Sequence, residues 1–160
     1  MTITDEMYSA PPATLAGRIL GIDFGLKRVG LAVSDPMQII ARALETVQYQ
    51  SRKELLRRLV ESIRQNEIVS VVMGLPRHMD GSEGEMAKTV RELMAELAAR
   101  VAIPIVAWDE RLSSVQAQRA LREMGISARN TKRGDVDRLA AVFILQSYLD
   151  SLKRKPDCKL

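Results

Sequence analysis

Apolar residues fall into short runs in the first part of the chain, with polar or glycine-containing breaks between them. Residues 18–24 (RILGIDF) and 28–35 (RVGLAVSD) are two such runs around a tight break, which is typical of an antiparallel hairpin. Residues 41–49 are expected to add a third strand. The near-continuous apolar run at 67–75 is typical of a central strand buried on both faces. A further strand is predicted at 101–110, and it ends on acidic residues.

Helical spacing of apolar residues marks the segments between and after these strands. Residues 51–66 carry leucine, valine and isoleucine at that spacing, and two Ser/Glu or Ser/Gln pairs three positions apart are typical of capping boxes. Helices are therefore predicted at 51–66, from Ser82 to about Arg100, from Ser113 to about Met124 and, after a polar, basic loop at 125–135, at 136–155.

Three leading strands followed by helix–strand alternation predict an α/β fold. We expect a five-stranded mixed sheet with helices on both faces. The chain of 160 residues suits a single domain with one sizeable core. We assign this domain to residues 17–152. Residues 1–16 are expected to form a flexible extension, and residues 153–160 a charged tail.

The composition limits which partners and which kinds of metal site the protein can have. The chain is 46% hydrophobic and 28% charged, as in an ordinary globular protein, and its net charge of +4 leans towards an anionic partner. A single cysteine, Cys158, and a single histidine, His78, exclude a disulfide framework and a Cys- or His-rich metal site, and fit a cytoplasmic setting. No apolar stretch approaches the ~18 residues of a membrane span, so no membrane partner is expected.

Acidic residues stand where strands or helices begin or end. Asp23 ends the first strand, Glu110 ends the last, and Asp137 lies near the start of the final helix with Asp135 just before it. Sites in α/β sheets form outside the strand ends, so carboxylates far apart in sequence can converge there. Clustered carboxylates repel one another unless cations are present, and oxygen ligands without His or Cys suit Mg²⁺ or Mn²⁺. Two such ions ~4 Å apart can clamp both reacting oxygens of a phosphodiester.

Each acid alone has a simpler interpretation. Asp23 could be a turn former, and Glu110 could pair with Arg111 on a surface loop. Asp135 is well placed as a helix N-cap, and Asp137 could serve only the helix dipole. The conjunction of the acids is more informative than any one of them.

Four segments stand out within about residues 18 to 150: GIDFGLKRVGLAVSD, VVMGLPRHMDGSE, WDERLSS and VDRLAAVFILQSYL. Together they resemble the signature blocks of the YqgF/RuvX family. These small bacterial proteins have an RNase H-like fold and are described as Holliday junction resolvase-like and as nucleases that mature the 5′ end of pre-16S ribosomal RNA. The resemblance implies a metal-dependent endonuclease of structured nucleic acid, with the first strand central and with Asp23, Glu110 and Asp137 as catalytic, metal-binding carboxylates.

One position departs from the family pattern. The residue two before the last aspartate is often basic in such proteins, and here it is Asp135, which leaves open whether Asp135 or Asp137 faces the metals. Helical residues two apart point about 200° apart, so both can hardly reach one metal pair. We expect Asp137, four residues before Ala141, to lean over the strand ends, and Asp135 to cap the helix.

Basic residues near the acids are candidates for phosphate contacts, which dominate nucleic-acid affinity. A solvated side chain is the simpler interpretation for an arginine after a strand or for a run of charges. Trp108 is expected in the core rather than as a base-stacking platform. The candidate nucleic-acid-binding residues are Lys27, Arg28, Arg77, Arg111, Arg129, Lys132 and Arg133.

Other classes of function remain as alternatives. The chain could be a nucleic-acid-binding module without catalytic activity. The GIDFG turn also resembles the phosphate loop of actin-like ATPases and sugar kinases, but those proteins need two such domains and a longer chain. No motif chooses RNA over DNA, since that choice rests on contacts to the 2′-hydroxyl. A four-way DNA junction has two-fold symmetry, so cleaving it would favour a homodimer.

Overall fold

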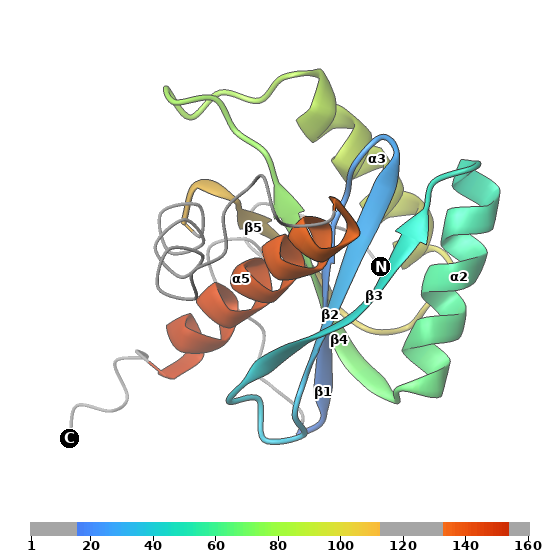
Figure 1. Cartoon of the computed structure of the whole chain (residues 1–160), viewed down its shortest axis with the longest axis vertical. Coiled ribbons are helices and arrows are strands. Elements are labelled where there is room, and N and C mark those ends of the chain that lie inside the picture. The colour runs from blue at the N-terminus through green and yellow to red at the C-terminus, as the bar shows by residue number, and fades with distance from the viewer. Residues whose placement is uncertain (1–15, 113–132, 154–160) are drawn as a thin grey trace.

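Five strands form one mixed sheet with helices on both faces, as predicted (Figure 1). The structure, a computed structural model, describes residues 16–112 and 133–153, and the side chains of 16–112 and 139–153. Its elements are β1 (Arg18–Asp23), β2 (Arg28–Ser34), β3 (Ala41–Gln48), α2 (Arg52–Gln65), β4 (Ile68–Leu75), α3 (Glu85–Ala98), β5 (Ile105–Asp109) and α5 (Arg133–Lys153).

The sheet order is β3-β2-β1-β4-β5, which confirms that the first strand is central. β1 pairs antiparallel with β2, and β2 pairs antiparallel with β3. β1 is parallel to β4, and β4 is parallel to β5. The carboxyl ends of β1, β4 and β5 therefore meet at one edge of the sheet.

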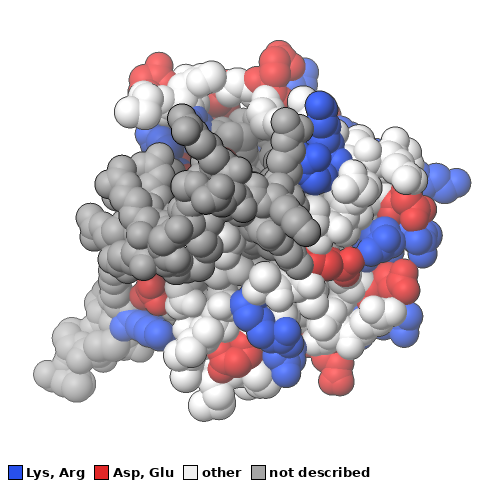
Figure 2. All heavy atoms as spheres, in the orientation of Figure 1, with Lys and Arg blue, Asp and Glu red and all other residues white. Residues whose placement is uncertain are grey.

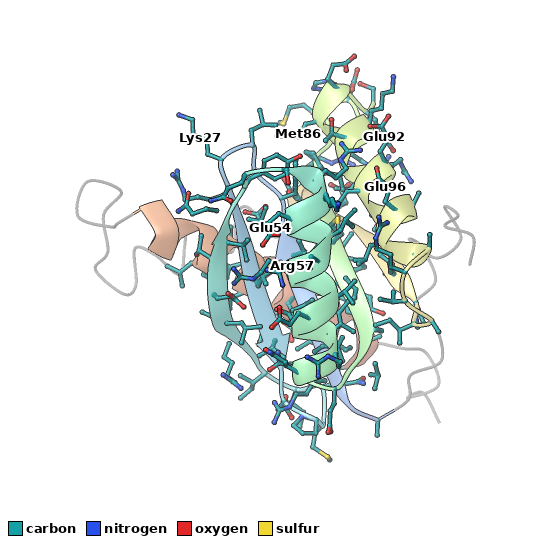
Figure 3. All side chains as sticks on the ribbon, turned by 90° about the vertical axis from the view of Figure 1, so that its right-hand side faces the viewer. Lys27, Glu54, Arg57, Met86, Glu92 and Glu96 are labelled. Carbon is teal, nitrogen blue, oxygen red and sulfur yellow. The ribbon has the colours of Figure 1, made fainter. Side chains whose placement is uncertain are left out.

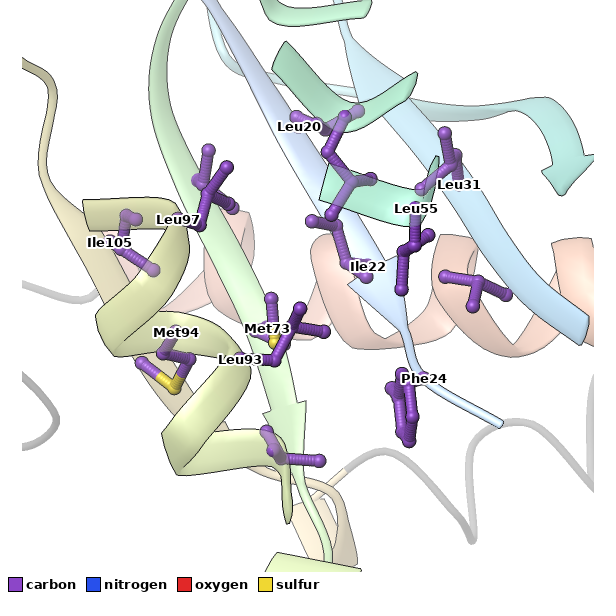
Figure 4. Packing of buried hydrophobic residues seen from close by; sticks show 14 of the residues in the cluster. Leu20, Ile22, Phe24, Leu31, Leu55, Met73, Leu93, Met94, Leu97 and Ile105 are labelled. Atoms are coloured by element: carbon purple, nitrogen blue, oxygen red, sulfur yellow. The ribbon is translucent and has the colours of Figure 1, made fainter. Parts of the chain in front are cut away.

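The larger core lies between the sheet and the helices α2 and α3. Alternate residues of the central strands, such as Leu20, Ile22 and Met73, are fully buried against Leu55 and Leu93 (Figure 4). The Ser51 side chain caps α2 by accepting a hydrogen bond from the Glu54 backbone N–H. On the outer side, ion pairs link α2 to α3, and Arg57 and Glu54 pair along α2 (Figure 3). The pairs between the helices join Arg52 to Glu92 and Glu96.

The smaller core lies on the opposite face, where α5 covers the sheet. Gly21 of β1 allows close approach, because a Cβ there would lie 2.8 Å from the Leu145 Cβ. Trp108 packs edge-on against Tyr148 with ring centroids 5.3 Å apart, and its indole N–H donates to the Ser147 hydroxyl. The prediction that Trp108 belongs to the core is confirmed.

Three predicted boundaries are wrong. Gly84, not Ser82, is the N-cap of α3, because the Ser82 amide and hydroxyl donate to the Asp80 carboxylate instead. β5 begins only at Ile105, after Pro104. α5 begins at Arg133, so Asp135 lies inside the helix rather than at its cap.

Several predictions fall outside the described residues: the helix from Ser113, most of the basic loop at 125–135, the N-terminal extension and the charged tail. Among the helices of the described residues, none is long and apolar enough to cross a bilayer.

Candidate active site

Strand alternation brings two of the predicted acids to the same face of the sheet. Ile19 of β1 and Trp108 of β5 pack against α5, so Asp23, four residues after Ile19, and Glu110, two after Trp108, share that face. Both acids stand at the edge where the parallel strands end. The Glu110 backbone N–H donates to the Leu75 carbonyl at 3.1 Å, which extends the pairing of β5 with β4 by one residue.

The side chains of Asp23 and Glu110 meet by a hydrogen bond, although β4 lies between their strands. Gly74 of β4 makes this approach possible. The register that pairs Ile22 with Met73 brings Asp23 level with Gly74, which has no side chain to separate the acids. A Cβ at Gly74 would lie 2.8 Å from Glu110 Oε1 and 2.6 Å from Ile144 Cδ1. Gly74 therefore leaves the space that both Glu110 and α5 occupy.

Burial raises the pKa of the Glu110 carboxyl above its ordinary value, and the negative charge of neighbouring Asp109 raises it further. The hydrogen bond with Asp23 acts in the opposite direction and lowers this pKa. Two carboxyl groups can share a hydrogen bond only while one of them holds a proton. Without a cation, the pair therefore favours a shared proton over two adjacent charges.

Helix α5 places the third predicted acid on the same side of the sheet. Ala141 and Ile144 are buried against the sheet, and the helical position of Asp137 is four and seven residues before them. The N-terminal end of α5 also lies nearer the edge where β1 and β4 end than its C-terminal end does (Figure 1). The helical position of Asp135 is about 200° away. The side chains of both aspartates lie outside the described part of the chain, in which no cluster of three metal-ligating residues occurs.

Asp109 is a residue of this region that the sequence alone did not single out. Its side chain is 5% exposed and forms an ion pair with Arg111 at 2.6 Å. The signal was present in the sequence, because Asp109 alternates with Trp108 and Glu110 and must face the opposite side of the sheet. The simpler interpretation of Glu110 paired it with Arg111 on a surface loop. In the structure, Arg111 forms its ion pair with the neighbouring Asp109.

The predicted nucleic-acid contacts occupy different environments. Lys27 is exposed at the turn between β1 and β2, where it projects from the loop (Figure 3), and Arg28 is half-buried at the start of β2. Arg77 is not the solvated arginine of the simpler interpretation: its side chain is 19% exposed, pairs with Glu83 at 3.3 Å and donates to the Gly81 carbonyl. Arg129 and Lys132 lie outside the described residues, as does the side chain of Arg133.

Acidic and basic side chains are interleaved over the face shown in Figure 2. In its described part, this face has no block of a single charge. The described residues of this face therefore form no uniform basic surface for an anionic partner.

Comparisons with known proteins agree with this arrangement. The fold matches T. thermophilus RuvC in complex with a Holliday junction substrate, with a TM-score of 0.58 at 18% identity over 87% of this chain and 98% of that one. A fowlpox virus Holliday junction resolvase aligns with a TM-score of 0.51 at 13% identity, over 84% of this chain and 99% of that one. At such identities these structures show the fold, which is the RNase H-like fold of RuvC-type resolvases.

The sequence comparisons identify the family. The family model described as "RuvX: Holliday junction resolvase" matches residues 17–151. A Koribacter versatilis protein named "Putative pre-16S rRNA nuclease" is 45% identical over 87% of this chain and 90% of its own length. A Mycobacterium ulcerans protein of the same name is 49% identical over 87% of this chain and 82% of its own length. The chain belongs to the RuvX family of nucleases.

Proposed function

We propose that this protein is a divalent-metal-dependent nuclease that hydrolyses phosphodiester bonds with Asp23, Glu110 and Asp137. The observation that carries the proposal is the meeting of the Asp23 and Glu110 carboxyl groups over Gly74, at the edge where three parallel strands end. A chain gains no stability from two half-buried carboxyl groups in contact, so their meeting supports a role in binding a cation.

The residues fit Mg²⁺ or Mn²⁺. All the donors are carboxylate oxygens, which these ions prefer. A cation would offset the burial and the negative charge of Asp109, which raise the pKa of Glu110. Asp23 on the central strand, Glu110 and Asp137 are the residues that would hold the ions. Bound there, the ions would supply an activated water and neutralise the charge that develops on the phosphate. The protein's part is to hold the carboxylates together on rigid strand ends and to exclude water from one side with α5.

Basic side chains around the acids are proposed to hold the nucleic-acid backbone. Lys27 lies in the turn after the strand of Asp23 and Arg28 begins the next strand, so both are candidates for this role. Arg129, Lys132 and Arg133 precede Asp137 in the chain and stay candidates for the same role. Such contacts position a nucleic acid without reading its sequence.

We propose the 5′ end of pre-16S ribosomal RNA as the substrate, because this is the activity for which the relatives are named. Processing of ribosomal RNA would place the protein in the cytoplasm. A four-way DNA junction is the second candidate, and the description of the family favours it. The two-fold symmetry of a junction would call for a homodimer. Side-by-side cleavage of a ribosomal RNA precursor and a four-way junction decides between them, with the mass of the protein measured in solution alongside.

Metal dependence tests the site itself. EDTA should abolish cleavage, and Mg²⁺ or Mn²⁺ should restore it. Asp23→Asn keeps the side-chain shape and removes the charge, so it should lower the cleavage rate by orders of magnitude while the fold is retained. Full activity in EDTA, or near-normal cleavage by Asp23→Asn, contradicts the proposal. Binding of either nucleic acid without cleavage in any metal would instead identify a binding module.

A further inference from the structure

Arg111 follows Glu110 directly, and its guanidinium is held by contacts within the protein. Nε and Nη2 donate to both oxygens of the Asp109 carboxylate at 2.6–3.1 Å, and the Arg111 backbone N–H donates to the same carboxylate at 2.9 Å. The Asp109 side chain is almost fully buried, on the face of the sheet opposite Glu110. Arg111 therefore anchors the end of β5 from the side that faces away from the acids.

The remaining nitrogen of Arg111 points to the loop between β4 and α3. Nη1 lies 3.4 Å from the carbonyl oxygens of both His78 and Met79. This loop is itself cross-linked: the His78 backbone N–H donates to the Ser82 carbonyl, and the Gly81 backbone N–H donates to the His78 carbonyl. Arg111 thus joins the segments that follow two neighbouring strands, β4 and β5.

We propose that Arg111 is a positioning residue that fixes the Glu110 carboxylate against Asp23, rather than a direct contact to the nucleic acid. This inference rests on the proposed function of the site. Glu110 stands one residue beyond the end of β5, and two ionised carboxylates in contact would repel each other in the absence of a cation. The contacts of Arg111 with Asp109 and with the loop restrain the backbone on both sides of Glu110, so that the carboxylate stays over Gly74.

The geometry of the pair predicts that lysine cannot replace this arginine. The planar fork of arginine donates to both oxygens of Asp109 and still reaches the loop, whereas an ammonium is a single point charge. A phosphate contact, in contrast, depends largely on charge, and Arg111→Lys would retain much of it. Arg111→Lys therefore separates the two roles.

The experiment compares the wild type with Arg111→Lys and Asp109→Asn, and Arg57→Ala serves as the control. Arg57 is an exposed arginine on α2, paired with Glu54 and remote from the strand ends (Figure 3). Four quantities are measured: the cleavage rate at saturating RNA or junction, the Kd of the same nucleic acid in Ca²⁺, the dependence of that Kd on salt, and the affinity of the protein for Mn²⁺ without nucleic acid.

For a positioning residue, Arg111→Lys and Asp109→Asn should both lower the cleavage rate at saturation about 10- to 100-fold and weaken Mn²⁺ binding. The Kd for nucleic acid and its salt dependence should stay at the wild-type and Arg57→Ala values. Circular dichroism and melting curves show whether each variant is folded. If Arg111→Lys does not fold, Asp109→Asn carries the test. It keeps the shape at the end of β5 and removes the ion pair, together with the negative charge that acts on Glu110.

A direct phosphate contact predicts the opposite pattern. Arg111→Lys would then leave the rate at saturation intact and retain much of the affinity for nucleic acid, and Asp109→Asn would release Arg111 and tighten nucleic-acid binding. Either result overturns the inference. If the wild type itself does not cleave with Mn²⁺, the proposed function fails, but the Mn²⁺ affinities still test the positioning role: an affinity unchanged in Arg111→Lys would refute it.

Discussion

Adding one methyl group at Gly74 should damage cleavage far more than it damages stability. Gly74→Ala introduces a Cβ 2.8 Å from Glu110 Oε1, 2.9 Å from Glu110 Cγ and 2.6 Å from Ile144 Cδ1. Non-bonded heavy atoms prefer separations of about 3.5–4.0 Å, so each neighbour must move by about 1 Å. Glu110 can do so by rotating its side chain away from β4, which also carries its carboxylate away from Asp23.

The two contacts have different consequences. Overpacking against Ile144 should lower the free energy of unfolding by about 1–3 kcal/mol, because α5 has to shift from the sheet. Displacing a catalytic carboxylate by about 1 Å should lower the cleavage rate about 100-fold. The assays are chemical denaturation and cleavage of a nucleic acid under single-turnover conditions with saturating Mn²⁺.

A second substitution separates these effects. Ile144→Val removes the Cδ1 atom that the new methyl group would meet, so the Gly74→Ala/Ile144→Val variant should recover stability relative to Gly74→Ala. It should not recover cleavage, because the contact with Glu110 remains. Ile144→Val alone is the control for the lost methyl group. If Gly74→Ala cleaves at the wild-type rate, or if the double variant restores cleavage, Gly74 serves only the packing of α5.

Three further predictions concern the acids and the smaller core. Asp137→Asn should abolish nearly all cleavage at saturating Mn²⁺ and Asp135→Asn should retain most of it, since their helical positions are about 200° apart; the reverse result would move the catalytic assignment two residues upstream. Because burial raises the pKa of Glu110, its carboxyl group binds a proton more tightly in the folded metal-free protein than in the unfolded chain. Protonation therefore stabilises the fold: this contribution is complete below pH 4.5 and is lost as the pH rises through the folded-state pKa. Melting temperatures from acid to neutral pH should show this loss, and it should be absent in Glu110→Gln. Burial also raises the pKa of Tyr148 to about 12, and its hydroxyl has no hydrogen-bond partner in the described residues. Tyr148→Phe should therefore leave the free energy of unfolding unchanged or raise it by about 1 kcal/mol. Urea denaturation measures this, and a clear loss of stability would reveal a partner.

The periodicity of apolar residues along the chain was sufficient to predict most of the strands and helices. The apolar runs of β1, β2 and β4 and the helical spacing of α2 each depend on neighbouring residues, so they are legible in the sequence, and the signature blocks placed β1 at the centre. The ends of helices were less predictable. Ser82 has the spacing of a capping residue, but a local hydrogen bond to Asp80 competes for its side chain, and only the folded loop shows which contact forms.

The acids were candidates from the sequence alone, because a carboxylate beside a buried strand costs free energy unless a partner or a cation compensates it. How they meet depends on the tertiary structure. The space over Gly74 exists only once β4 lies between β1 and β5 with Ile22 level with Met73, and this pairing joins residues far apart in the chain. The ion pair that holds Arg111 similarly depends on Asp109 being buried beneath the sheet, which is a property of long-range packing and not of the local sequence.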